Sequence, residues 1–239
     1  MVRQMDGDAG DDMISKRDFD QEAVTWDEKP GRIKLAADVA TAIMKSVKVR
    51  SDMDVLDYGC GTGLLTLSLQ PYVHSITGAD SSHGMLDVLN AKIKKYSLTN
   101  VKTQYLDLEI GDALEDRFHL ITSSMTFHHI NDPLLLINKF YNLLHPNGYL
   151  CIADLDPDEG KFHSNKEGVI HFGFERSFMR ELFIQAGFNN ISDTTVAIID
   201  KDVPDEGIRS FSVFMMKGQK ILTGFPGKDK TDSGIHGKR

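Results

Sequence analysis

Three glycines at alternate positions, Gly59, Gly61 and Gly63, constrain the fold of this chain more than any other feature. They follow a short apolar segment over residues 54–58, which predicts a buried strand, and they precede residues 64–69, which predict a helix. Glycine adopts backbone angles that other residues avoid, and it lets a ligand come close to the main chain. A strand, a glycine-rich turn and a helix N-terminus in succession therefore indicate a site for a polar ligand group.

Strand and helix patterns alternate along the rest of the chain. We expect helices at residues 32–48, 64–69, 82–95, 133–144 and 178–186, and strands at residues 54–58, 75–80, 101–108, 119–124, 148–155, 190–200 and 209–217. The apolar stripe of the first helix consists of Ile33, Ala36, Ala40, Ile43, Met44 and Val47. Alternation of this kind predicts parallel strands with helices on both faces. No helix separates the last two strands, so the predicted fold is α/β, with a doubly wound, mostly parallel seven-stranded sheet and an antiparallel C-terminal strand.

Composition narrows the possible partners. The 239 residues include 27 basic and 35 acidic side chains, a formal net charge of −8, which disfavours a nucleic-acid partner. No apolar run approaches the roughly 20 residues of a membrane span, and the polar start lacks the apolar block of a secretory signal. Two cysteines, Cys60 and Cys151, are too few for a disulfide framework, so we expect both to be small buried residues. These features predict a cytoplasmic protein with a mobile acidic arm over residues 1–18 and a disordered tail over residues 219–239.

An acidic residue ends the second predicted strand. Asp80 lies 17 residues after Gly63, where an acid reaches ribose hydroxyls in nucleotide-binding α/β folds. Loop and acid together predict a ligand with an adenosyl group. The dinucleotide fingerprint would need a glycine where Leu64 stands, so a nicotinamide-dependent oxidoreductase is the less favoured alternative.

The stretch from residue 19 to residue 218 resembles the class I S-adenosylmethionine-dependent methyltransferases, in particular their type 11 small-molecule branch. The resemblance rests on Phe19-Asp20, Trp26-Asp27 and Arg32, on residues 78–81 with Met85-Leu86, and on residues 106–108, 124–130 and 143–148. It implies a Rossmann-like methyltransferase domain over residues 19–218, with an N-terminal cap at residues 19–50 and a lid at residues 156–176.

The resemblance also implies which residues bind S-adenosyl-L-methionine. They are Arg32, Asp57, Gly59, Gly61, Gly63, Asp80, Ser81, Met85, Asp107, Leu108 and Ser124. The glycines would pass the methionine part and Asp57 would hold their loop. Asp80 would accept from the ribose and Met85 would lie against the adenine. Asp107 and the Leu108 amide would meet the ring edge, and the Ser124 carbonyl would face the ammonium.

Histidines mark the expected acceptor side. His128 and His129 follow the fourth strand, where either imidazole could serve as a base or line the site, or could simply hold the loop. We expect Phe19, Trp26, His163 and His171 to bind the substrate, the last two from the lid. Asp154, Asp156, His163 and His171 could also be considered as metal ligands, but their spacing fits no known motif, and we expect no metal.

The function that these features favour is methyl transfer to a small molecule by in-line displacement. The alternatives are a methyltransferase acting on protein or RNA and a non-catalytic S-adenosylmethionine-binding protein. Ser124-Met125-Thr126-Phe127 stands where methyltransferases of planar nitrogens carry an Asn-Pro-Pro-Tyr-like signature, which lowers the case for such acceptors.

Overall fold

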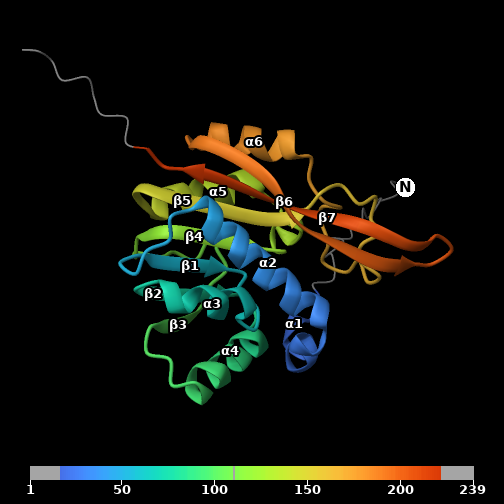
Figure 1. Ribbon diagram of the computed structural model, residues 1–239, viewed down its shortest axis with the longest axis horizontal. Helices are drawn as coiled ribbons and strands as arrows, with labels where there is room; N and C mark the ends of the chain where they lie inside the picture. Colours follow the sequence, from blue (N-terminus) through green and yellow to red (C-terminus); the bar gives the residue numbers. More distant parts are fainter. Residues whose placement is uncertain (1–16, 110, 222–239) are drawn as a thin grey trace, which may run out of the picture.

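A single seven-stranded sheet organises the chain (Figure 1). The computed structural model describes residues 17–109 and 111–221. The strands are β1 (Asp54–Tyr58), β2 (Ser75–Asp80), β3 (Val101–Tyr105), β4 (Phe118–Ser124), β5 (Leu144–Leu155), β6 (Asn189–Val203) and β7 (Gly207–Gln219). Their order is β3-β2-β1-β4-β5-β7-β6, and β1 to β5 pair in parallel. Strand β7 is antiparallel to both β5 and β6, which confirms the predicted fold.

Helices cover both faces of this sheet. They are α1 (Phe19–Glu22), α2 (Pro30–Ser46), α3 (Leu64–Leu69), α4 (His83–Lys95), α5 (Pro133–Leu143) and α6 (Arg176–Gln185), with 3-10 turns η1 (Ala23–Glu28), η2 (Gln70–Tyr72) and η3 (Phe127–His129). Proline opens α2 and α5, where its missing N–H leaves no helical bond unmade. Ser82 caps α4 by accepting from the Met85 amide, so the chain turns into this helix directly after β2.

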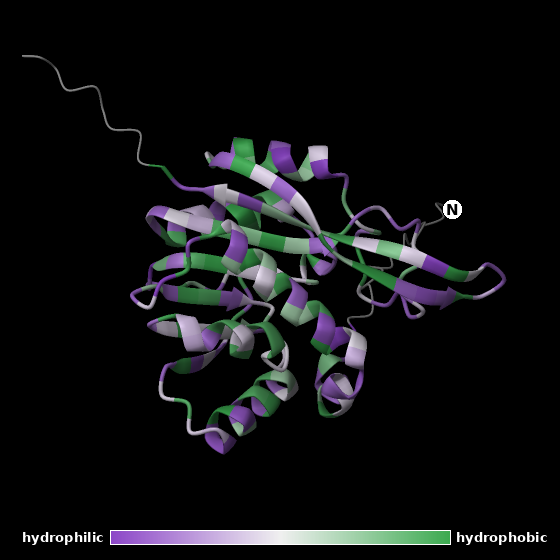
Figure 2. Ribbon diagram, in the orientation of Figure 1, coloured by the Kyte–Doolittle hydropathy of each residue, from purple (hydrophilic) through white to green (hydrophobic). Residues whose placement is uncertain are grey.

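Two apolar clusters form the core, one on each face. Helices α2 and α3 pack over one face through Val39, Ile43 and Leu69, and α5 and α6 pack over the other through Phe140 and Phe183. The central strands are largely apolar, whereas β6 at the edge alternates between polar and apolar residues (Figure 2). Cys60 and Cys151 are both buried and unpaired, as expected.

Some predicted boundaries were wrong. Helix α2 starts at Pro30 and ends at Ser46, and Ile33 in its first turn is 48% exposed instead of buried. Strand β3 ends at Tyr105, three residues early, and β5 begins at Leu144. Only residues 17 and 18 of the predicted arm lie within the described residues. Of the predicted tail, only residues 219–221 lie within them. No helix in the described ranges is long and apolar enough to cross a membrane.

The last two strands are longer than their sequence pattern indicates. Strands β6 and β7 continue to pair up to Val203 and Gly207, because Asp205 and Gly207 take positive φ angles in a tight turn. Figure 1 shows this hairpin reaching past the other strands, beside the loop between β5 and α6, which contains most of the lid predicted over residues 156–176. The loop contacts the hairpin through the rings of Phe162 and Phe211, whose centroids lie 5.4 Å apart.

Candidate active site

The glycine loop has the backbone that its sequence demands. Gly59, Gly61 and Gly63 have φ angles of +70°, +53° and +83°. A Cβ at Gly59 would lie 2.3 Å from the Thr126 hydroxyl oxygen, and one at Gly63 would lie 2.3 Å from a Leu89 methyl carbon. A Cβ at Gly61 would meet nothing closer than 3.8 Å. Packing and φ therefore both require glycine at positions 59 and 63, whereas a Cβ at position 61 would make only ordinary van der Waals contacts.

Two carboxylates, the buried Asp57 and the partly buried Asp80, hold the loop. Asp57, 1% exposed, accepts a 2.6 Å hydrogen bond from the Thr66 hydroxyl, and burial raises its pKa to about 7. Asp80 accepts from the Gly61 amide at 2.8 Å and from the Ser82 amide at 2.9 Å. Burial raises the pKa of Asp80 above its ordinary value, although these amides act in the opposite direction. The Ser81 amide also bonds to this carboxylate, which offers about four acceptor positions and so retains capacity for a further donor.

The N-terminal segment α1–η1 lies over the loop. The Thr62 hydroxyl donates to Asp27 at 2.6 Å, and the Lys92 ammonium lies 2.5 Å from the same carboxylate. Trp26 places its indole nitrogen 4.0 Å from the Cβ position at Gly61, and the Arg32 guanidinium stacks 3.4 Å from the Trp26 ring. The expected cap therefore contacts the loop through both polar and aromatic groups.

The residues expected near an adenine ring follow β2 and β3. Met85 is 2% exposed, and Asp107 accepts from the Glu109 amide at 3.0 Å. The Leu108 amide donates to the Tyr58 hydroxyl at 3.3 Å, so this donor already has a partner inside the protein. Ser81 directly follows Asp80 at the end of β2, between the acid and the α4 cap.

Three imidazoles meet beyond the end of β4. The ring of His128 lies 4.1 Å from that of His129 and 4.8 Å from that of His163, measured between centroids. Phe19 from the cap contacts His129 edge-on at 5.3 Å. Thr126 links this cluster to the glycine loop, because its hydroxyl lies beside Gly59 and donates to the Ser124 carbonyl at 3.2 Å. We call His128, His129 and His163 the imidazole cluster.

A buried carboxylate orients the innermost imidazole. His128 Nδ1 lies 2.8 Å from Asp154 Oδ1, and the two side chains are 2% and 0% exposed. Because the carboxylate can only accept, Nδ1 carries the proton and Nε2 is the free acceptor in the neutral ring. Burial alone would raise the pKa of Asp154, but His128 and the amides bonded to this carboxylate lower it overall.

The outer imidazoles are uncharged at neutral pH. Burial, reinforced by His128, lowers the pKa of His129 to about 4 and that of His163 to about 3. His129 Nδ1 bonds the Gly168 carbonyl at 2.6 Å. His163 Nδ1 is buried without a partner in the described part of the chain. Neutral rings of this kind can accept a proton or a hydrogen bond from a substrate.

Other residues singled out in the sequence lie apart from the cluster. His171 bonds the Ile130 carbonyl at 2.9 Å and holds the lid to the end of η3. Asp156 is engaged by Arg176 at 2.6 Å. Of the four residues considered as metal ligands, Asp154, Asp156 and His171 therefore have separate partners. The described residues contain no group of three or more His, Cys, Asp or Glu arranged to hold a metal.

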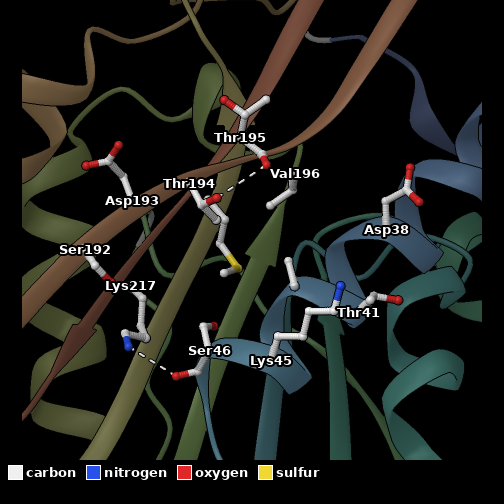
Figure 3. A pocket seen from close by; sticks show the side chains of 12 residues that line it. Asp38, Thr41, Lys45, Ser46, Ser192, Asp193, Thr194, Thr195, Val196 and Lys217 are labelled. Atoms are coloured by element: carbon white, nitrogen blue, oxygen red, sulfur yellow. Dashed lines mark hydrogen bonds between the residues drawn. The ribbon is translucent and has the colours of Figure 1, made fainter.

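A groove lies elsewhere on the molecule. It has a volume of about 490 Å³ and runs between α2 and the strands β6 and β7 (Figure 3). Its lining includes Lys45, Thr194 and Lys217, none of which contacts the glycine loop or the imidazole cluster. We do not place the active site there.

Three important residues were missed in the sequence. Thr126 was considered only within the segment after the fourth strand, and Asp154 only as a metal ligand. Lys201, whose ammonium donates to the Phe162 carbonyl from the far end of β6, gave no signal. These roles depend on contacts between segments that are distant in the sequence. For Asp154, its position as an acidic residue at the end of a predicted central strand could have indicated a role.

Fold and glycine loop together define a Rossmann-like nucleotide-binding α/β protein. The family model of the methyltransferase domain matches residues 31–193, which is more than half of the chain. The chain therefore belongs to the methyltransferase family, in the class I group that uses S-adenosylmethionine as its cofactor.

Individual relatives agree with this assignment. An uncharacterised methyltransferase of Schizosaccharomyces pombe is 33% identical over 174 residues, 66% of this chain and 61% of that protein. A ubiquinone biosynthesis O-methyltransferase of Coxiella burnetii is 33% identical over 102 residues, 43% of each chain. The chain thus spans between about two fifths and three fifths of these relatives. The crystal structure of a SAM-dependent methyltransferase from Aquifex aeolicus shares the fold, with a TM-score of 0.62, 18% identity, and coverage of 84% of this chain and 98% of that one.

Proposed function

We propose that the protein transfers the methyl group of S-adenosylmethionine to a small-molecule acceptor held against the imidazole cluster. The observation that carries this proposal is the placement of the cluster beside the glycine loop, with Thr126 between them. In support, one relative is named as an O-methyltransferase of ubiquinone biosynthesis. The net charge of −8 and the cap over the loop disfavour a nucleic-acid acceptor. A cytoplasmic location stays a prediction.

The residues around the loop fit the cofactor. Asp80 has acceptor capacity left for the ribose hydroxyls, and Gly61, without a side chain, would let a ligand approach the backbone. Met85 is positioned by the Ser82 cap, and its sulfur lies 3.8 Å from the Cβ position at Gly61. Arg32, stacked on Trp26, would face the carboxylate end. The Leu108 amide would have to exchange its Tyr58 partner to reach the adenine edge, so we assign that contact a lesser role.

The chain's main task in the reaction is to align and enclose the reactants. Bound S-adenosylmethionine supplies an activated methyl group on a sulfonium, which needs no further activation by the protein. In-line attack requires the acceptor atom on the side of the methyl opposite the sulfur, and positioning of this kind contributes up to roughly 7–11 kcal/mol. The cap, with Trp26 and Phe19, excludes water from the loop.

An acceptor that starts as a hydroxyl must also lose a proton. His128 is oriented by Asp154 through Nδ1, so its Nε2 can take that proton, while the neutral His129 and His163 rings can accept hydrogen bonds from the acceptor. Asp154 acts as a positioning residue, since it fixes the tautomer without touching the acceptor. Base catalysis contributes about 10²–10⁴ in rate where a base is needed.

The test is release of S-adenosylhomocysteine from S-adenosylmethionine with a cell extract split by ultrafiltration. Turnover with the low-molecular-mass fraction supports the proposal. Turnover only with the retained protein or RNA contradicts it, and cofactor binding without turnover in either fraction would favour the non-catalytic alternative. A matched pair, Asp154→Asn and the surface variant Asp87→Asn, separates positioning from folding. We expect Asp154→Asn to lower kcat and shift its pH profile, with cofactor affinity unchanged.

A further inference from the structure

Two positively charged side chains approach the imidazole cluster, in a protein that is acidic as a whole. Lys201, near the end of β6, lies 4.3 Å from the centre of the Phe162 ring and donates to the Phe162 carbonyl. The Phe162 ring contacts His163 at 4.9 Å. The Arg17 guanidinium, just before the cap, lies 5.0 Å from the Phe19 ring, which in turn contacts His129. One phenylalanine ring therefore separates each of these cations from the imidazole cluster.

The carboxylates near these groups already have partners. Burial lowers the pKa of Lys201, and the positive charges of Lys29, Arg32 and Arg17 lower it further. Asp27 lies 2.5 Å from the Lys92 ammonium, and Asp154 is bound to His128. Glu22 is bound to Arg17 by two 2.6 Å hydrogen bonds. Both oxygens of Asp158 accept from lid amides, those of Gly160 and Phe162.

Lys201 itself has no carboxylate within ion-pair distance in the described ranges of the chain. Its only hydrogen-bond partner there is the Phe162 carbonyl. A half-buried ammonium among other cations is stabilised by an anion that enters the same space, because Coulomb attraction is stronger away from bulk water. The same cations repel a positively charged acceptor.

We propose that Lys201, with Arg17, forms an anion subsite beside the imidazole cluster, and that the acceptor carries a carboxylate or a phosphate group. This inference rests on the proposed function, and it names the class of acceptor that the function needs. The Phe19 and Phe162 rings each contact an imidazole of the cluster, so the subsite suits an anion attached to a flat apolar body. Arg32, through its stacking on Trp26, belongs to the cofactor side and is not part of the subsite.

The experiment compares anionic fragments with a neutral analogue on the full chain. Ligand-observed NMR titrations at fixed ionic strength use benzoate, phenyl phosphate and benzamide, each with and without S-adenosylhomocysteine. We expect at least one anion to bind about tenfold or more tightly than benzamide, because a charge-assisted hydrogen bond is lost in the neutral compound. The tighter of the two anions tells a carboxylate acceptor from a phosphate acceptor. Equal affinity for all three fragments, or no binding by either anion, overturns the proposal.

A pair of lysine variants assigns the effect to the subsite. Lys201→Met keeps the apolar stem and removes the charge. Lys217→Met is the matched control, because Lys217 also donates to a backbone carbonyl, that of Ser46 at 3.1 Å, and lies 6.0 Å from an aromatic ring on a neighbouring strand. We expect the anion affinity to fall about tenfold in Lys201→Met only, with benzamide binding unchanged.

Calorimetry with S-adenosylhomocysteine distinguishes failure of the proposed methyl transfer from failure of the anion subsite. If Lys201→Met weakens S-adenosylhomocysteine binding as much as it weakens anion binding, the positive charges serve the cofactor, and the anion subsite is wrong. If the wild-type protein binds no S-adenosylhomocysteine but still prefers the anions, the proposed methyl transfer fails while the subsite stands.

Discussion

Acidification should destabilise the protein through the outer imidazoles. The pKa of His129 falls from 6.5 to about 4 on folding, and that of His163 to about 3. The unfolded chain therefore binds more protons than the folded one between pH 6.5 and pH 4, so the contribution of these rings to stability is present at pH 7 and is lost as the pH falls. Carboxylates with lowered pKa values, such as Asp154, lose their contribution only below about pH 4.

The size of the effect follows from the shift. For His129, about 2 kcal/mol is lost between pH 7.5 and pH 5, since each unit of pKa shift amounts to about 1.4 kcal/mol when fully expressed. His163 is more exposed, and solvent screening reduces its share to about 1 kcal/mol. Asp57, whose pKa is raised to about 7, acts in the opposite direction over the same range. The quantity to compare is therefore the difference between wild type and variant.

The assay is thermal unfolding of wild type, His129→Gln and His163→Asn from pH 7.5 to pH 5. Relative to wild type, His129→Gln should gain about 2 kcal/mol at the acidic end, or about 4–8 °C in Tm for a chain of this size. The control is His83→Gln, which removes an exposed imidazole outside the imidazole cluster. If both cluster variants keep the pH dependence of wild type, the rings are not held neutral by burial, and the premise for their role as acceptors is lost.

Three further predictions concern the site. Asp80→Ala should weaken S-adenosylmethionine binding at least about tenfold in calorimetry, because it removes charge-assisted hydrogen bonds worth about 1.5–3 kcal/mol, while Asp87→Ala should not; tight NAD binding instead would contradict the assignment. Gly61→Val should abolish cofactor binding and leave circular dichroism unchanged, since a β-branched residue is strained at a φ of +53°; an unchanged Kd would reduce the loop to a simple turn. His128→Ala should slow single-turnover methyl transfer with unchanged cofactor affinity, and a wild-type rate would leave His128 a structural role only.

Local sequence determined most of the architecture. Strands β1 and β2 and helix α3 have the predicted bounds, because short apolar runs bordered by glycine, proline or a capping serine leave little choice of element. The glycine loop was equally predictable, since only glycine suits three positive φ angles so close together. Asp57 and Asp80 could be placed because they lie at fixed distances along the chain from that loop.

The acceptor side depended on contacts between distant segments. His128 and His129 were predicted from the sequence, but the partner that orients His128 lies 26 residues further along, at the end of β5. His163 joins them only because the lid folds back over η3, where His171 and Gly168 bond to it. His171 was expected to share the substrate role, yet its imidazole is taken up by a backbone carbonyl.

The sequence by itself determined the strand–loop–helix unit and hence the family, because these depend on backbone angles and on spacing within some 30 residues. Only the tertiary structure decided which charged side chains lie near the imidazole cluster. Lys201 reaches the imidazole cluster because β6 and β7 keep pairing beyond the sheet, and Arg17 reaches it because the cap lies over the loop. Coulomb interactions depend on distance in space, and a linear sequence does not contain those distances.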